Sequence, residues 1–124
     1  MKRSCGISVP IFSLLSPYGI GTLGQAAYDF IDFLKAAGQS WWQMLPLGPT
    51  GYGDSPYQSF STYAGNPYFI DPELLLRDGL LTREELSSVN WGSDPSRVDY
   101  GALYNHRFPL LRKAAARGWE REHE

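Results

Sequence analysis

The chain has 124 residues, of which 43% are hydrophobic and 19% charged, and its formal net charge is −2 at pH 7. This composition is typical of a soluble globular domain and excludes collagen-like, disulfide-rich and disordered chains. The sequence contains no basic run of the kind that follows a phosphate backbone, so nucleic acid is not expected as a partner. No segment approaches the roughly 18 consecutive apolar residues of a membrane span, and no membrane partner is expected.

The amino-terminal residues 1–15 combine a basic tip with an apolar run, as a signal peptide does. Pro10 interrupts that run, and no small-x-small cleavage site follows it. The single cysteine, Cys5, has no partner for an internal disulfide, which fits a reducing compartment. We therefore expect a cytoplasmic protein. A small buried residue on a strand is the favoured interpretation of Cys5, with a catalytic thiol as the alternative.

The first half of the chain has the pattern of a βαβ unit. Residues 6–15, GISVPIFSLL, predict a short buried strand. Residues 25–37 carry apolar side chains at steps of three and four, which predicts an amphipathic helix that Gly38 ends. Residues 40–48, SWWQMLPLG, predict a second strand whose near-continuous apolar character is typical of a parallel strand covered on both faces.

The second half predicts a long loop followed by short helices. Residues 49–71 are rich in Gly, Pro, Ser and Tyr, and the stretch is too long and too aromatic for a simple connection. Residues 72–118 are expected to be helical. The expected caps are Asp71, Thr82 with Glu85 in a T-x-x-E capping box, and Asp99, and Pro109 is expected as a kink or a fresh start.

Three glycines match the G-x-G-x-x-G pattern of a dinucleotide-binding loop: Gly19, Gly21 and Gly24. That fingerprint needs a strand running straight into the first glycine and an acidic residue about 20 positions later. Residues 16–18 intervene before the first glycine, and residues 44–47 are apolar where the acid should lie. We therefore interpret these as loop glycines that allow positive φ and close backbone approach, and expect no nucleotide cofactor.

The loop 49–71 concentrates aromatic rings on a backbone that Gly and Pro hold in turns. The rings are Tyr52, Tyr57, Phe60, Tyr63, Tyr68 and Phe69, and the polar residues beside them include Asp54 and Ser55. Sugars suit such a loop, because the CH face of a pyranose packs on a ring while polar groups bond its hydroxyls. We favour sugar contact for Tyr52 and Tyr57. Phe60 and Phe69 lack a polar tip, and we expect them to pack beneath the loop.

Other candidate sites have simpler explanations. Asp54 and Asp71 could form the carboxylate pair of a glycosidase. Asp71 precedes a proline, however, and is better explained as a helix cap, which leaves Asp54 without a partner. His106 and His123 have no second ligand at useful spacing, so no metal site is expected.

Three stretches closely resemble the amino-terminal region of amylomaltases, the 4-α-glucanotransferases also called disproportionating enzymes. They are SPYGIGTLG (16–24), LPLGPTGYGDSPYQSFSTYAGNPYFID (45–71) and RVDYGALY (97–104). The similarity covers nearly the whole chain, from Gly6 to about Arg117. It implies an α/β fold, the amino-terminal portion of a (β/α)8 TIM barrel that is incomplete in this chain. The segment 1–124 would then comprise the first βαβ unit, a substrate loop 49–71 and a helical insertion 72–118.

The resemblance also implies an activity. Members of this family transfer an α-1,4-glucan segment to the 4-hydroxyl of an acceptor glucan or glucose by a retaining double displacement without a cofactor. Maltooligosaccharides, amylose and other α-1,4-glucans would therefore be the ligands. The family's aspartate nucleophile, glutamate acid/base and stabilising aspartate lie on later barrel strands, so no catalytic residue is assigned within this chain.

Substrate-binding residues can be carried over from the family motif. Tyr57, in DSPY, matches the tyrosine that lines the donor sugar next to the scissile bond, and Ser55 and Asp54 belong to the same loop. Tyr52, in GYG, and Tyr104, in GALY, match the two tyrosines of a secondary glucan-binding groove.

A complete eight-stranded barrel needs roughly 250 residues, so the chain is expected to be an enzyme segment that is inactive by itself. Its two strands would keep exposed edges, which favours aggregation or partial folding. A stand-alone, non-catalytic α-glucan-binding module is the alternative.

Overall fold

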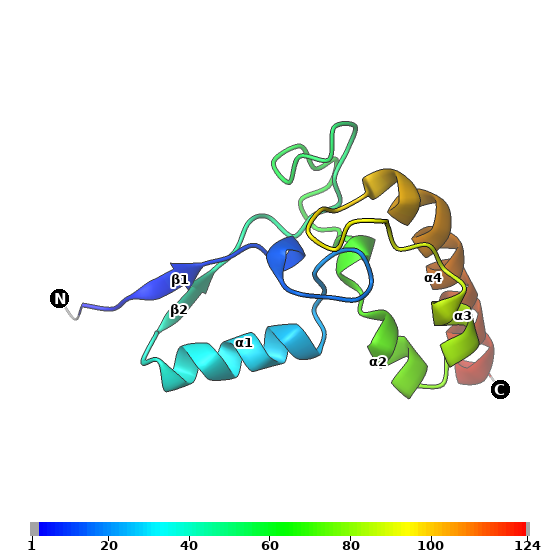
Figure 1. Ribbon diagram of the computed structural model, residues 1–124, viewed down its shortest axis with the longest axis horizontal. Helices are drawn as coiled ribbons and strands as arrows, with labels where there is room; N and C mark the ends of the chain where they lie inside the picture. The colour runs from blue at the N-terminus through cyan, green and yellow to red at the C-terminus, as the bar shows by residue number, and fades with distance from the viewer. Residues whose placement is uncertain (1–2, 124) are drawn as a thin grey trace. The chain divides into compact units, whose positions relative to one another are not determined.

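The computed structural model describes residues 3–123, and the chain divides into two compact units (Figure 1). The first unit contains the described residues up to Ser16 together with Ile20–Ile70. The second contains Pro17–Gly19 and the chain from Asp71 onward. Within residues 3–123, no helix is both long and apolar enough to cross a membrane.

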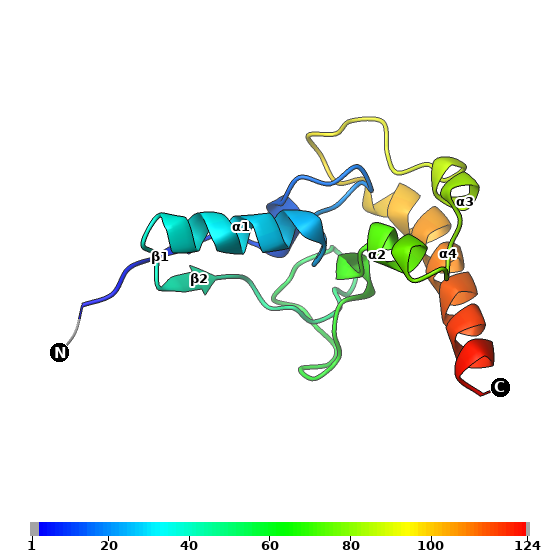
Figure 2. The same ribbon diagram turned by 90° about the horizontal axis from the view of Figure 1, so that it is seen from below.

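A βαβ unit forms the start of the first unit, as predicted. Strand β1 (Gly6–Ser8) pairs in parallel with β2 (Trp41–Gln43), and Gly6 lies opposite Trp41. Helix α1 (Gln25–Ala36) connects them and lies alongside the strand pair (Figure 2). The parallel pairing follows from this order, because a helical crossover returns the chain in the same direction.

Both strands are much shorter than the predicted ranges 6–15 and 40–48. Pro10 has no N–H to give to a ladder, and the chain turns after it into the 3-10 helix η1 (Ile11–Ser13). Strand β2 ends at Gln43, three residues before Pro46, which has no N–H for a ladder. The predicted burial of the first strand was also wrong, since β1 is exposed throughout. Trp41 in β2 is 66% exposed, in line with the exposed strand edges expected of an incomplete barrel. Cys5, expected to be buried, is exposed.

Helix α1 confirms the predicted amphipathic segment. Ala27 and Leu34, two turns apart, are its buried residues, and the Phe30 ring meets the Trp42 ring edge-on at 4.9 Å between centroids. Gly38 follows the helix at φ +70° and provides the expected stop.

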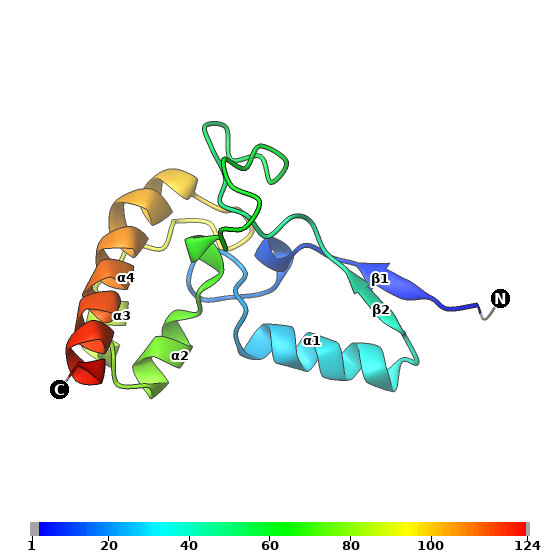
Figure 3. The ribbon, with the colours of Figure 1, turned by 180° about the vertical axis from the view of Figure 1, so that it is seen from behind.

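The second unit is helical, with α2 (Pro72–Arg77), α3 (Arg83–Ser87) and α4 (Tyr100–Glu122) (Figure 3). All three predicted caps are present. Asp71 Oδ1 accepts from the N–H groups of Glu73 (2.8 Å) and Leu74 (3.1 Å), Thr82 and Glu85 form the capping box, and Asp99 Oδ1 accepts from the N–H of Ala102 (2.9 Å). Each cap satisfies donors that the first helical turn leaves without intrahelical partners.

Helix α4 runs through Pro109 without interruption, so of the two alternatives for this residue, a kink or a fresh start, the fresh start is excluded. Proline removes one intrahelical hydrogen bond, but the helix is held by tertiary packing. Its buried residues, at steps of four, three and four, are Leu103, Arg107, Leu110 and Ala114. Leu110 and Ala114 belong to a core that also contains Tyr18, Leu81 and Leu86.

Candidate functional site

The segment that follows β2 carries most of the sequence-predicted site residues. Its first part is closed by an antiparallel bridge between Thr50 and Ser59, and the Gly51 N–H donates to the Gln58 carbonyl at 3.2 Å. These contacts bring the ends of the turn together. Tyr52, Asp54, Ser55 and Tyr57 therefore lie on one compact turn.

The tip of this turn has an uncommon backbone conformation. Asp54 adopts φ +55°, the one non-glycine positive φ among the described residues, and its N–H donates to the Gly51 carbonyl at 3.2 Å. Aspartate tolerates this left-handed region better than most residues. Ser55 Oγ then accepts from the Tyr57 N–H at 3.4 Å. Local hydrogen bonds thus define the path of the backbone from Asp54 to Tyr57.

The rings of the loop divide into an exposed and a buried set. Tyr52 and Tyr63 are fully exposed, and Tyr57 keeps 72% of its surface. Phe60 is 78% exposed, so its expected packing beneath the loop was wrong, whereas Phe69 is buried as predicted. Phe60 is the central residue of a turn in which Ser59 Oγ donates to the Ser61 carbonyl (2.7 Å) and accepts from the Ser61 N–H (3.3 Å).

The exit of the loop is anchored by backbone bonds. The Asn66 N–H donates to the Leu47 carbonyl at 2.8 Å, and Asn66 Oδ1 accepts from the Tyr68 N–H at 3.0 Å to begin the 3-10 helix η2 (Pro67–Phe69). The Phe69 carbonyl accepts from the Leu23 N–H at 2.9 Å. The residues 20–24 and the exit of the loop are therefore hydrogen-bonded to each other.

Tyr104 belongs to the second unit, on the first turns of α4. It is 67% exposed, and its ring meets the Phe108 ring edge-on at 5.6 Å between centroids. The other four predicted binding residues lie together on the loop. Tyr104 presents an exposed aromatic ring on the second unit.

The glycine pattern is explained by local backbone requirements. Gly19 has φ +77°, and a Cβ at this position would overlap the Trp91 carbonyl. A Cβ at Gly21 would overlap the Ile11 carbonyl in the same manner. Positive φ and close backbone approach confirm the interpretation as loop glycines.

The carboxylate, histidine and cysteine side chains of residues 3–123 do not gather into a metal-binding cluster. Asp71 serves as the α2 cap, which confirms the structural interpretation of that residue. Over residues 3–123, no group of three or more His, Cys, Asp or Glu side chains could hold a metal ion.

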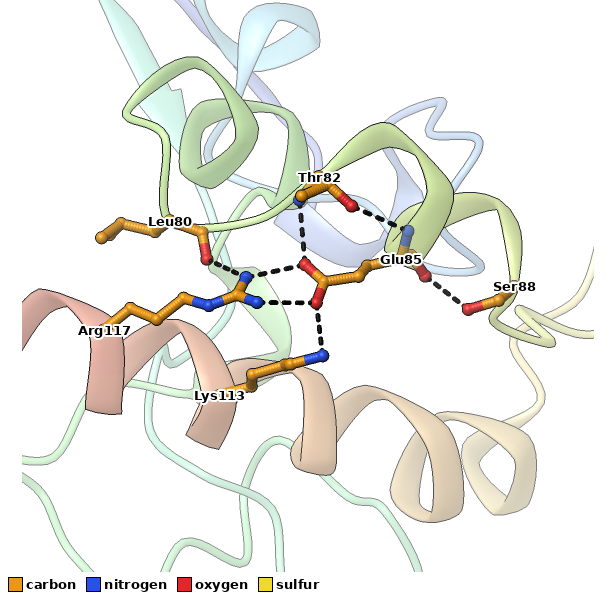
Figure 4. Close-up of polar contacts among 6 residues, drawn as sticks. All are labelled: Leu80, Thr82, Glu85, Ser88, Lys113 and Arg117. Atoms are coloured by element: carbon orange, nitrogen blue, oxygen red, sulfur yellow. Dashed lines mark hydrogen bonds and ion pairs between the residues drawn. The ribbon is translucent and has the colours of Figure 1, made fainter.

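A charged cluster in the second unit was not predicted from the sequence (Figure 4). Arg117 donates from both Nη atoms to the Glu85 carboxylate, at 2.8 and 2.9 Å, and Lys113 forms a second ion pair with it. Arg117 also donates to the Leu80 carbonyl at 3.0 Å. The bonds from Arg117, Lys113 and the Thr82 backbone lower the pKa of Glu85 to about 2. The sequence signal for this charged cluster was a pair of basic residues, Lys113 and Arg117, four positions apart on α4.

Tyr18 belongs to another network that sequence reasoning missed. Its hydroxyl donates to the Glu73 carboxylate, which Arg83 also contacts with both Nη atoms. Burial is the largest cause that raises the pKa of Tyr18, and the Glu73 bond adds to it. The Arg83 and Tyr18 hydrogen bonds lower the pKa of Glu73. The two charged networks connect residues up to 55 positions apart in the chain.

Comparison with known proteins gives consistent matches. A family model described as 4-alpha-glucanotransferase matches residues 9–124. A 4-alpha-glucanotransferase of Streptococcus pneumoniae is 55% identical over 119 residues, covering 96% of this chain and 24% of that protein. One from Thermus thermophilus is 51% identical over 114 residues, covering 92% of this chain and 22% of that protein.

A solved structure agrees with these matches. The amylomaltase from Streptococcus agalactiae in complex with acarbose superimposes with a TM-score of 0.88 at 46% identity, covering 93% of this chain and 23% of that chain. This chain thus spans about a quarter of the length of the relatives that it matches.

Proposed function

The chain belongs to the 4-alpha-glucanotransferase family, and on this premise we propose that it is the amino-terminal portion of a (β/α)8-barrel 4-α-glucanotransferase. The parallel β1–α1–β2 unit supports this proposal, because a strand, a crossover helix and a parallel strand are the repeating unit of such a barrel. The boundaries are the first βαβ unit, the substrate loop 49–71 and the helical insertion 72–118. The complete protein would transfer an α-1,4-glucan segment to the 4-hydroxyl of another glucan or of glucose.

The role of this chain in that reaction is to bind the glucan. The observation that carries the proposal is the exposed Tyr57 ring on a hydrogen-bonded turn that also presents Asp54 and Ser55. A ring held in this manner loses little entropy when a sugar stacks on it. The complex of the related amylomaltase with acarbose supports a carbohydrate ligand. Maltooligosaccharides, amylose and other α-1,4-glucans are the proposed ligands.

Tyr52 and Tyr104 are proposed to bind longer chains outside the active centre. Both rings are exposed, and neither is required by the core. Stacking platforms along the path of a flexible amylose chain raise its affinity by adding independent contacts. Short donors do not reach such platforms.

The chemistry itself is assigned to residues outside this chain. A retaining transfer needs a nucleophilic carboxylate and an acid/base carboxylate about 5–5.5 Å apart. Asp71 caps α2 through its side-chain oxygen. We assign no catalytic role to Asp54. The proposed reaction needs no cofactor, and the cytoplasm is the proposed location.

The experiment compares Tyr57→Ala with Tyr52→Ala and Tyr104→Ala in the complete protein. Tyr57→Ala should lower kcat/KM for every donor, by roughly 10- to 100-fold, because the donor sugar loses its positioning contact. The other two variants should weaken amylose binding about two- to tenfold, the value of one aromatic stack, and leave maltotriose transfer nearly unchanged. Glucose release from maltotriose and amylose titration measure the two effects.

Tyr28→Ala, a half-exposed tyrosine on α1, is the matched control and should leave both measurements unchanged. Equal effects of all three variants on both substrates would refute the division of roles. Amylose binding without any glucan transfer by the wild-type protein would favour the alternative, a non-catalytic α-glucan-binding module.

A further inference from the structure

The segment that follows β2 makes a close contact at Gly48. A Cβ at this position would lie 2.5 Å from Ser59 Oγ and 3.1 Å from the Ser61 carbonyl oxygen. The φ of Gly48 is not positive, so the requirement for glycine here is one of space. Ser59 is half-buried between two exposed neighbours. Its side chain therefore packs directly on the backbone at position 48.

Both sides of this contact are held by hydrogen bonds. Ser59 Oγ donates to the Ser61 carbonyl at 2.7 Å and accepts from the Ser61 N–H at 3.3 Å. On the other side, the Leu47 carbonyl accepts from the N–H of the buried Asn66 at 2.8 Å. Because the serine hydroxyl both donates and accepts on one neighbour, its rotation would break two bonds. The contact between Ser59 and Gly48 is therefore a fixed point of the loop.

The turn that carries Tyr57, residues 50–59, closes at the same serine. The Ser59 backbone bridges to Thr50, and the preceding Gln58 carbonyl accepts from the Gly51 N–H at 3.2 Å. The Tyr57 ring, 72% exposed, lies two residues before Ser59 in the chain. The position of this ring therefore depends on where Ser59 is held.

We propose that Ser59 is a positioning residue for Tyr57. Its side chain packs the closing end of the turn 50–59 against the Gly48 backbone and so sets the position of the Tyr57 ring. All of these residues belong to the first unit. The inference rests on the proposed function for the contact between Tyr57 and the donor sugar. The packing of the turn is measurable without any ligand.

The first test is hydrogen exchange of the complete protein, followed by mass spectrometry of the peptide that contains Gly51. Ser59→Ala removes both bonds to Ser61, so the Gly51 amide should exchange about three- to tenfold faster. Ser61→Ala is the matched control. It removes a hydroxyl that accepts from the Ala64 N–H at 3.2 Å, in the same loop, and should leave exchange at Gly51 near the wild-type rate. Unchanged exchange in Ser59→Ala, or equal exchange in the two variants, would overturn the proposal.

Gly48→Ala tests the same contact from its other side. The added Cβ would displace Ser59 Oγ and break its bonds, so this variant should exchange at Gly51 as Ser59→Ala does. In the double variant the nearest remaining atoms, Ser59 Cβ and the Ser61 carbonyl oxygen, lie 3.1 Å from the added Cβ. The two changes remove one interaction, so the double variant should exchange about as fast as either single variant. Multiplied effects would show that Gly48 and Ser59 act independently and would overturn the proposal.

The second test asks whether Ser59 acts through Tyr57. Ser59→Ala should raise the KM for maltotriose about three- to tenfold and leave kcat within about twofold of wild type, because the reacting carboxylates lie elsewhere. In the Tyr57→Ala background the same change should alter kcat/KM by less than about twofold, since the ring that it positions is gone. An undiminished loss in that background would overturn the positioning role.

The positioning role and the proposed function fail in different ways. Faster exchange at Gly51 with an unchanged KM would refute the positioning role of Ser59, and a loss of transfer in Tyr57→Ala would still support the proposed function. Faster exchange at Gly51 together with wild-type transfer by Tyr57→Ala would instead refute the sugar contact of Tyr57 and leave the packing of the turn confirmed.

Discussion

The Trp91 carbonyl decides which residue can occupy position 19. Gly19 combines a φ of +77° with contact to that carbonyl and to the Leu103 side chain, so both conformation and space exclude a Cβ. Gly79, which follows α2, has a similar φ of +73° but nothing within 4 Å of its would-be Cβ. Position 79 therefore requires glycine for its backbone conformation alone, whereas position 19 requires it for both conformation and packing.

Gly19→Ala should be more destabilising than Gly79→Ala. Both changes force alanine into the left-handed region, at about 1–2 kcal/mol. Gly19→Ala adds an overlap with backbone, which costs a further ~1–3 kcal/mol. Urea unfolding of the two variants beside the wild type measures the difference. Equal losses at the two positions would show that the Trp91 carbonyl moves away without cost.

At the scale of elements, one carboxylate links α3 to α4. Glu85 closes the capping box of α3 and binds Arg117 and Lys113, which are 32 and 28 residues further along the chain. The Arg117 fork and the Leu80 carbonyl extend the contact to the turn before α3. A bidentate, partly shielded arrangement of this kind contributes more than an isolated surface ion pair.

The folded-state pKa of Glu85, about 2, lies below the ordinary value of 4.5, and this sets the direction of the pH effect. The contribution of the ionised Glu85 to the free energy of unfolding is fully present above about pH 4.5 and is lost as the pH falls towards 2. Glu85→Gln should therefore lower Tm by several degrees at pH 7 and make Tm less dependent on pH between 4.5 and 2. Thermal melting across that range measures both effects.

Glu84→Gln provides the matched control, because Glu84 is the exposed neighbour on the same helix turn. It should leave Tm at pH 7 near the wild-type value. A Glu85→Gln variant that keeps the wild-type slope of Tm against pH would show that other groups carry the acid sensitivity.

At the scale of the whole chain, apolar surface of the first unit is exposed. Trp41 is 66% exposed to solvent, Phe33 61% and Ile31 49%. Trp41 and Ile31 also line a hollow of about 330 Å³ beside the short β2. Exposed strand edges with apolar neighbours promote association between chains.

Trp41→Lys should reduce self-association of the 124-residue chain. A charged side chain at the edge of β2 opposes pairing with another strand. Sedimentation velocity at matched concentrations should show a smaller weight-average mass than for the wild type. Trp119→Lys changes an equally exposed tryptophan (68%) on α4 and should have the smaller effect. A larger decrease in mass for Trp119→Lys than for Trp41→Lys would place the associating surface on the second unit.

Expectations that depended on near neighbours were confirmed. The caps at Asp71, Thr82 and Asp99 each act on N–H groups two or three residues away, so the sequence contains the whole interaction. Helix α1 and its end at Gly38 follow from the same kind of local signal. Local hydrogen bonds also define the turn that carries Asp54, Ser55 and Tyr57, and glucan binding by these residues stays a prediction.

Among the expectations that depended on distant partners, the parallel pairing of β1 with β2 was confirmed, whereas the burial of the first strand and of Phe60 was not. The sequence by itself determined the order of the elements, the helix caps, the aromatic loop and the family resemblance, because these are carried by short motifs. Only the tertiary structure decided that each strand is limited to three residues, that α4 continues through Pro109 without a fresh start, and that Tyr18 is buried. Tyr18 lies 55 residues from Glu73 and 89 from Arg107, and no local pattern encodes contacts over such separations. Packing free energy that is gained across the fold outweighs local preference at these positions.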